Sequence, residues 1–386
     1  MPLHEFTYEA LPGRVIFGIG AIDRVPAEVV ALGAERVLLI AGSHEREVAN
    51  RLATSLGHRL VGTLEDVRAH VPIDLAASAR ITAGDLGADL LITLGGGSTT
   101  GLGKAIALER GTPILAIPTT YAGSEMTPIW GLTEANRKTT GRDVRVLPKV
   151  VVYDPVLTLS LPPQLSAASG MNAMAHCVEA SYAEGGSPVV SAMALEGIAA
   201  LARALPAVLD HLEDLEVRSE LLYAAYLAGS SLAAAGSGLH HKICHVLGGA
   251  FDLPHAETHA LILPHAVAFN APAMPEAMDR IGRALGVDDP AAGLFDLDVA
   301  LGLPTRLTEI GMREADLDEA AALICRDVHD NPQPVDVPSL RRLLGDAAAG
   351  RRPMVKPATG GPAPSTPEGL AQPGARVAQA TQVGPP

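Results

Sequence analysis

"LITLGGGSTTGLGK", residues 91–104, joins a short apolar run to a helical pattern through three consecutive glycines and a serine. A strand that turns directly into a helix leaves backbone N–H groups at the positive end of the helix dipole, where they can hold a phosphate. The spacing matches neither a Walker A loop nor GxGxxG. We predict an anion-binding turn whose contacts come from Gly95, Gly96, Gly97 and Ser98.

Further apolar runs alternate with helical patterns on both sides of this turn. The runs are "RVLLIAG" (36–42), "PILAIPTT" (113–120) and "KVVVYDP" (149–155), and the helices are expected over residues 73–88 and 98–110. This alternation predicts a parallel sheet with helical crossovers. Residues 1–155 are therefore expected to form a Rossmann-like α/β dinucleotide-binding domain, with ligands at the carboxyl ends of its strands.

Long Ala/Leu patterns replace the strand-like runs from about residue 156. Examples are "SAMALEGIAALARALPAVLDHL" (191–212) and "RSELLYAAYLAGSSLAAAG" (218–236), which predict an all-α domain over residues 156–350. The remaining residues, 351–386, contain 8 of the 30 prolines and almost no large apolar side chain. Such a segment cannot offset its ordering entropy by burial, so we expect a disordered tail.

Composition narrows the class of partner. The formal net charge is −14, and the 29 Lys and Arg residues are scattered, which argues against nucleic acid and anionic membranes. The three cysteines are too far apart for a disulfide framework or a metal knuckle. Neither a signal peptide nor an apolar run of about 18 residues is evident. We expect a cytoplasmic protein that acts on a small molecule.

A second polar cluster follows the strand expected at 113–120. In "IPTTYAGSEMTP" the residues Thr119, Thr120 and Ser124 could contact the pyrophosphate and ribose of a dinucleotide, and Lys149 is assigned to the same cofactor. The strand expected at 36–42 is followed by Gly42 and Ser43, and not directly by an acid that would select a ribose 2′-hydroxyl. NADH and NADPH both stay open.

Histidines recur at helical spacing in the predicted all-α domain. Asn172 and His176 lie four residues apart, as do His241 and His245, and His255 follows after a turn. Converging imidazoles of this kind suit a divalent metal or a proton-transfer cluster. A single histidine in such a helix is more often a hydrogen-bonded core residue, so the clustering is what favours a site.

Five stretches in this order resemble the iron-containing alcohol dehydrogenase superfamily, and within it the maleylacetate reductases. They are "GGGSTTGLGKAIAL", "IPTTYAGSEMTPIWGLTE", "LPKVVVYDPVLTLSLPP", "SGMNAMAHCVEA" and "HHKICHVLGGAFDLPHAETHALILPHAVAFN". The resemblance implies an active site between a dinucleotide-binding domain and a helical domain, and a homodimer. Metal-dependent members hold a divalent ion at the positions of Asn172, His176, His241 and His255, with a further active-site histidine at His245.

Two residues depart from the metal-dependent pattern. Asn172 stands where those enzymes have an aspartate, which removes the anionic ligand, and Gly101 stands where they commonly have Asp. Both features resemble maleylacetate reductases, so no metal is expected. The implied reaction is NADH- or NADPH-dependent reduction of the conjugated C=C bond of maleylacetate to 3-oxoadipate.

In that reaction negative charge develops on the ketone oxygen as an enolate. Hydrogen-bond donors can stabilise an enolate without a Lewis acid. We expect His245 and His241 to donate protons, and His176 and His255 to complete the pocket. The residues expected to bind the substrate are Tyr121, His240, Lys242 and His329.

Three rival hypotheses stay open. The first is a metal-dependent alcohol dehydrogenase on the same scaffold, with Asn172 as a ligand. The second is a dehydroquinate-synthase-like lyase, which needs a phosphorylated substrate and a more basic pocket. The third is a binding protein without nicotinamide, in which the glycines form turns and the histidines belong to the core.

Overall fold

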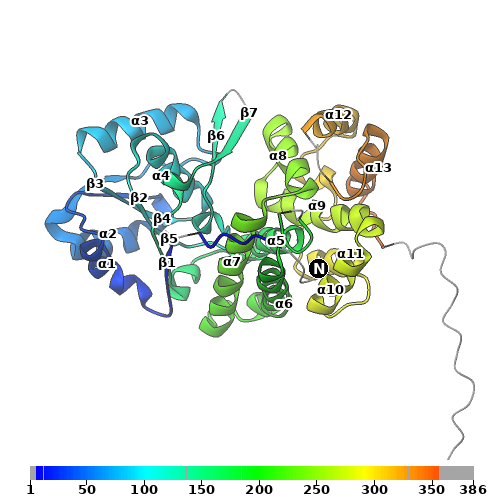
Figure 1. Cartoon of the computed structure of the whole chain (residues 1–386), viewed down its shortest axis with the longest axis horizontal. Helices are drawn as coiled ribbons and strands as arrows, with labels where there is room; N and C mark the ends of the chain where they lie inside the picture. The colour runs from blue at the N-terminus through cyan, green and yellow to red at the C-terminus, as the bar shows by residue number, and fades with distance from the viewer. Residues whose placement is uncertain (1–5, 12, 135–136, 184, 328–330, 356–386) are drawn as a thin grey trace, which may run out of the picture. The chain divides into compact units, whose positions relative to one another are not determined.

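A six-stranded sheet forms the centre of the N-terminal half, in a computed structural model that describes residues 6–11, 13–134, 137–183, 185–327 and 331–355 (Figure 1). The strand order is β1-β8-β5-β4-β2-β3, and every pairing in this sheet is parallel. The strands are β1 (Arg14–Phe17), β2 (Val37–Ala41), β3 (Leu60–Leu64), β4 (Leu90–Gly95), β5 (Ile114–Pro118) and β8 (Val150–Tyr153). The predicted parallel α/β fold is confirmed.

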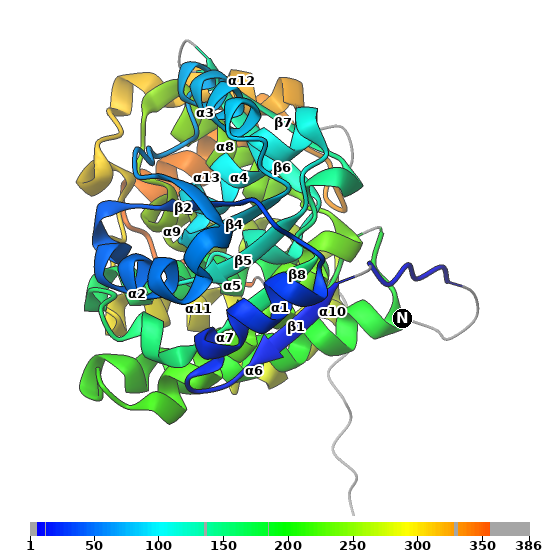
Figure 2. The ribbon, with the colours of Figure 1, turned by 90° about the vertical axis from the view of Figure 1, so that its left-hand side faces the viewer.

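The central strands are apolar throughout because helices cover both faces of the sheet. Val37 and Leu39 of β2 share a core with α1 (Val25–Ala31) and α2 (Arg46–Leu56), whereas Leu38 and Ile40 face α3 (Ile73–Asp85) and α4 (Gly97–Arg110). Successive side chains of a strand point to opposite faces, which explains the division. Figure 2 shows this half from its outer side.

Sequence analysis missed the short edge strands and one hairpin. β1 and β3 have only partly buried patterns, and β6 (Ile129–Glu134) pairs with β7 (Arg137–Arg142) in a separate antiparallel ribbon. The hairpin contains few fully buried residues, so the apolar signal that reveals the central strands is weak there. In Figure 1 the hairpin lies between the two halves, beside α8 (Leu239–Phe251), with which β7 is in contact.

Beyond β8 the described chain is helical, as predicted. The other helices are α5 (Pro163–Ala180), α6 (Pro188–Asp210), α7 (Leu215–Ala235), α9 (His255–Asn270), α10 (Pro275–Leu285), α11 (Pro290–Ala300), α12 (Leu317–Asp327) and α13 (Val337–Ala348). α5 packs against α6, α7 and α9, and almost all of its residues are buried. One hydrophobic cluster runs from the α3/α4 face of the sheet into these helices, so both halves belong to one compact unit that ends at Lys356.

α6 is long and apolar enough, by length and composition, to cross a membrane. The expectation that no run reaches such a length therefore fails for this helix. α6 nevertheless packs against α5, α7 and α10, and its buried residues include Ile198 and Leu201. These contacts are those of a core helix.

The ordered chain also extends beyond the predicted tail boundary at residue 351. Arg352 forms a two-point ion pair with Asp296 of α11, and the Val355 N–H donates to Asp289, the N-cap of α11. Residues 351–355 are therefore anchored, which corrects that boundary. The rest of the predicted tail lies outside the described residues.

Candidate active site

The glycine-rich turn lies at the carboxyl end of β4, where the sequence predicts it. Gly95 has φ of 149°, and a Cβ there would lie 2.4 Å from Thr99 Oγ1, so this position requires glycine. Gly96 caps α4, whose first-turn residues Gly97 and Ser98 follow directly. The Thr119 N–H donates to the Gly95 carbonyl (3.2 Å), which joins the end of β5 to this turn. Two expected cofactor segments, 95–98 and 119–120, are thus neighbours.

The carboxyl end of β2 adds a third segment and a carboxylate that sequence analysis did not consider. Gly42 and Ser43 follow β2, which is next to β4 in the sheet. Two residues later, Glu45 accepts a hydrogen bond from Thr119 Oγ1 at 3.2 Å. An acid therefore lies at the expected cofactor edge, just beyond the residues that follow the strand directly.

Lys149 lies elsewhere. It precedes β8, so it is at the amino end of a parallel strand, opposite the edge that contains Gly95. Its side chain is exposed, and its backbone N–H donates to the Ile114 carbonyl at the start of β5. The structure does not bring Lys149 to the expected cofactor site.

Ser124 belongs to a segment that a buried cation holds in place. Lys104 Nζ donates to the carbonyls of Ser124 (2.6 Å), Thr127 (2.8 Å) and Ile129 (2.7 Å). Burial lowers the pKa of Lys104 to about 7, against the opposing charge of Glu125. Lys104 thereby fixes the chain that leads from β5 to the hairpin.

Six histidines and two other polar side chains converge from three helices. α5 contributes Asn172, His176 and Glu179, α8 contributes His240, His241 and His245, and α9 contributes His255 and His259. The ring centroids of His176 and His241 are 4.8 Å apart, those of His241 and His245 are 6.1 Å apart, and those of His255 and His259 are 4.3 Å apart. The predicted convergence of the five expected residues therefore occurs.

The cluster has two layers. Its buried layer consists of Asn172, His176, Glu179, His240, His241 and His259, each at most 6% exposed. His255 is exposed and His245 is half-buried. These two, together with the half-buried His70, which precedes α3 and lies 6.4 Å from His255 by ring centroids, are called the outer imidazoles below. A substrate that approaches from solvent meets the outer imidazoles first.

A chain of hydrogen bonds runs through the buried layer. His241 Nδ1 pairs with Glu179 Oε2, His241 Nε2 lies 2.7 Å from His176 Nδ1, and His176 Nε2 lies 3.3 Å from the Ala122 carbonyl. A carbonyl only accepts, so His176 Nε2 carries the hydrogen and the neutral ring accepts at Nδ1. His241 Nε2 then donates to it. One further proton is shared between His241 Nδ1 and Glu179.

Glu179 is ionised, so it accepts this hydrogen bond from His241 Nδ1. Burial would raise the pKa of Glu179, but the imidazoles of His241 and His240 and the backbone donors lower it to about 2. The donors are the N–H groups of Gly238 (2.9 Å) and His240 (2.7 Å) at the start of α8. Burial and the neighbouring imidazoles lower the pKa of His176 well below its usual value, so it stays neutral. The buried layer thus contains one carboxylate, Glu179, which pairs with His241 Nδ1 and accepts from two backbone N–H groups.

The hydrogen-bonded chain does not fit a divalent metal. All ring nitrogens of His176 and His241 have partners, so a metal at the expected position would break this chain. Asn172 Nδ2 lies 3.4 Å from His176 Nε2, and its Oδ1 has no partner among the described residues. A half-turn of the amide pairs that oxygen with the Nε2–H. Another grouping, His240, His241 and His259, has ligand atoms within 4.8 Å of one another, but His240 Nε2 donates to the His259 carbonyl at 2.8 Å.

His259 is a further member of the cluster that was not predicted from the sequence. Its ring is 1% exposed, and neither nitrogen has a hydrogen-bond partner among the described residues. Burial and the surrounding imidazoles lower its pKa well below the usual value. The signal was present, because His255 and His259 repeat the four-residue spacing of His241 and His245.

The four expected substrate residues fare differently. Tyr121 is fully buried, and its hydroxyl accepts from Arg218 (3.1 Å), while His240 is fully buried against His259. Neither can reach a substrate as expected, since core packing already uses them. Lys242 is exposed on α8. His329 lies outside the described residues.

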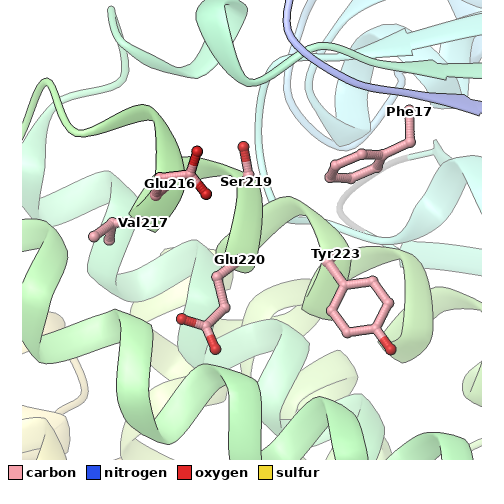
Figure 3. Close-up of a pocket in the computed structure, with 6 residues that line it drawn as sticks. All are labelled: Phe17, Glu216, Val217, Ser219, Glu220 and Tyr223. Carbon is pink, nitrogen blue, oxygen red and sulfur yellow. The ribbon is translucent and has the colours of Figure 1, made fainter.

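A separate surface hollow of about 420 Å³ lies away from the histidines, between β1 and α7 (Figure 3). Phe17 faces a row of α7 side chains that includes Glu216, Glu220 and Tyr223. Two carboxylates here would repel an anionic substrate or cofactor. This hollow is therefore not the expected site.

Comparison with known proteins gives the same family over both halves of the chain. Residues 12–155 match "Iron-containing alcohol dehydrogenase", and residues 166–347 match "Fe-containing alcohol dehydrogenase family, C-terminal". The maleylacetate reductase of Burkholderia cepacia is 50% identical, covering 91% of this chain and 100% of its own. That of Sphingobium indicum is 49% identical, covering 91% and 99%. The crystal structure of maleylacetate reductase from Rhizobium sp. strain MTP-10005 has 44% identity and a TM-score of 0.87, covering 91% and 100%.

Proposed function

The chain belongs to the iron-containing alcohol dehydrogenase family, and on this premise we propose that it reduces the conjugated C=C bond of maleylacetate to 3-oxoadipate. The proposal rests on sequence identity: two maleylacetate reductases are 50% and 49% identical to this chain over 91% of its length. We further propose that the enzyme uses NADH, needs no metal, and works as a cytoplasmic homodimer.

The reaction suits a site built from imidazoles. The 95–98 turn would hold the pyrophosphate of a nicotinamide cofactor, which when bound would supply a hydride for the alkene carbon β to the ketone. The C=C pair then becomes the enolate double bond, and the carbonyl pair moves onto the ketone oxygen. The resulting enolate takes a proton on the carbon next to the ketone. An enolate is a weaker base than the alkoxide of an alcohol dehydrogenase, so N–H donors suffice to stabilise it.

We expect His245 to give that proton, because it lies with His255 on the accessible side of the cluster. His241, expected as a second donor, is buried and donates to Glu179 and His176 instead. Its ring lies 6.1 Å from that of His245 by centroids, and we propose that the Glu179–His241 pair orients His245. His241 is therefore a positioning residue.

The preference for NADH follows from Glu45. A carboxylate at the carboxyl end of β2 accepts a ribose 2′-hydroxyl and repels a 2′-phosphate. Glu45→Gln should raise the NADPH to NADH ratio of kcat/KM about tenfold, since it removes one unit of repulsion at a half-exposed site. Glu47→Gln is the matched control, because Glu47 lies two residues further along the chain and is exposed in the first turn of α2. An unchanged ratio in Glu45→Gln contradicts the assignment.

The decisive experiment follows NADH oxidation with enzymatically generated maleylacetate, with and without EDTA, on protein whose metal content has been measured. We expect 3-oxoadipate and a rate that EDTA does not change. His245→Ala should lower kcat at least about 100-fold while the Kd of NADH stays the same. A rate that collapses with EDTA and returns with Fe²⁺ or Zn²⁺ would instead select the alcohol dehydrogenase hypothesis. Sedimentation analysis checks the dimer.

A further inference from the structure

A strained turn brings His70 to the edge of the histidine cluster. His70 has φ of 61° and the next residue, Val71, has φ of 49°. Two consecutive non-glycine residues in the left-handed region are rare, and the second is β-branched, for which this region is a clear outlier. Each costs on the order of 1–2 kcal/mol, so the surrounding structure must hold the turn in place.

Thr133 of β6 provides that hold. Its Oγ1 donates to the His70 carbonyl (2.8 Å), and its N–H donates to the Val71 carbonyl (3.1 Å). The next residue, Pro72, forms a bridge with Thr133. The hairpin that sequence analysis missed therefore clamps both strained residues.

Gly101 of α4 makes room for the turn from the other side. Val71 is 5% exposed, and a Cβ on Gly101 would lie 2.9 Å from Val71 Cγ2. Any larger side chain at Gly101 would push Val71 out of place. The departure at Gly101 noted from the sequence thus has a structural counterpart: it lets the strained turn pack against α4.

The strained turn places the His70 imidazole, which belongs to the sheet half of the chain, next to the histidines of the helical half. The rings of His70 and His255 are 6.4 Å apart at an angle of 77°. Rings at this separation can both donate to one oxygen at ordinary distances of about 2.8 Å. Strain that persists at such a place is a sign of function.

We propose that His70 binds one carboxylate of the substrate through an imidazole N–H, together with His255, and so selects a dicarboxylate over a simple alcohol or aldehyde. This inference rests on the proposed function, because it takes maleylacetate as the substrate. A carboxylate held between His70 and His255 leaves His245, the third outer imidazole, to serve the ketone end of the molecule.

His70→Gly tests the proposal, since glycine adopts a left-handed conformation without strain. The variant should fold with an unchanged or higher Tm. Its KM for maleylacetate should rise about 10- to 100-fold through the loss of a hydrogen bond to a charged group, with kcat within about threefold and the Kd of NADH unchanged. His70→Asn, which tolerates this backbone and keeps an N–H donor, should recover part of the KM. His58→Ala, an exposed histidine of the same half, is the control.

The substrate (Z)-4-oxopent-2-enoate, which lacks the carboxylate of the acetate arm, tells which carboxylate is bound. A KM penalty of His70→Gly that disappears with this compound assigns the acetate arm, and a penalty that persists assigns the carboxylate on the alkene. A wild-type KM for maleylacetate in His70→Gly overturns the proposal. If the wild-type enzyme itself leaves maleylacetate unreduced, the proposed function has failed instead.

Discussion

Glu179 is the residue on which the buried layer depends. It caps the N-terminus of α8 through the N–H groups of Gly238 and His240, and it pairs with His241 Nδ1. Without a carboxylate here, these buried donors would have no acceptor. The direction of each hydrogen bond in the chain from Glu179 through His241 and His176 to Ala122 therefore depends on the Glu179 carboxylate.

Glu179→Gln should lower kcat by about 10- to 100-fold, the range usual for residues that orient active-site histidines. The amide keeps one acceptor for the start of α8 but loses the second carboxylate oxygen, which pairs with His241 Nδ1. Steady-state kinetics with the Kd of NADH as reference measures the effect. Glu196→Gln, in α6, is the control. Wild-type kcat in Glu179→Gln would mean that His241 does not influence the reaction.

A buried histidine outside the cluster, His265, predicts a pH dependence of stability. Burial lowers its pKa to about 4, against the opposing charge of Asp346, from about 6.5 in the unfolded chain. Between these values the unfolded chain binds a proton that the native protein does not. The free energy of unfolding therefore falls as pH falls from about 6.5 to 4.

His265→Leu should remove up to about 3 kcal/mol of that acid-dependent loss, since each pKa unit corresponds to about 1.4 kcal/mol. Urea unfolding at pH 7.0, 5.5 and 4.5 measures it. The exposed His211, changed to Ala, should leave the pH dependence as it is. Parallel curves for His265→Leu and wild type would show that His265 titrates normally in the native protein.

At the scale of elements, the turn before α3 packs against α4. Helix α4, which follows the expected cofactor turn, is thereby linked to His70. The turn packs on α4 at Gly101 and is clamped by β6, so three elements determine one imidazole position. Helix α4 also contributes Lys104, which fixes the segment between β5 and β6. Helix α4 therefore supports both the expected cofactor turn and the proposed substrate-binding residue His70.

Gly101→Ala should raise the KM for maleylacetate, because the new methyl displaces Val71 and with it His70. Overpacking of this kind costs about 1–3 kcal/mol of stability. The double variant Gly101→Ala/Val71→Ala removes Cγ2 and should recover both KM and Tm. Gly13→Ala, where no atom lies closer than 3.8 Å to the new Cβ, is the control. A double variant no better than the single one would disprove the coupling.

At the scale of the whole molecule, the compact unit extends past α13, which ends at Ala348. Val355 packs against the large hydrophobic cluster, and Arg352 pairs with Asp296.

A chain that ends after Lys356 should match the full chain in Tm and kcat. A chain that ends after Gly350 should keep its activity at 25 °C but lose a few degrees of Tm, since exposed ion pairs contribute at most about 1 kcal/mol each. Differential scanning calorimetry compares the three, and equal Tm values would show that residues 351–355 add nothing.

The sequence alone determined the fold class, the glycine turn and the helices that contain the histidines. These features depend on local periodicity: fully apolar runs, a glycine-rich turn, and four-residue spacing along a helix. The same logic would have found His259, and it failed for β1, β3 and the hairpin, because edge strands have a weak apolar pattern.

Only the tertiary structure decided which side chains do what within the cluster. Helix packing buried His240 and His241, used their nitrogens internally, and left His245 and His255 accessible. It also brought Glu45 to Thr119 at the expected cofactor edge, and His70 to His255, across segments that no spacing rule connects. The physical reason is that residue type and local spacing set which groups share a face, whereas burial and hydrogen-bond partners arise only when distant segments pack together.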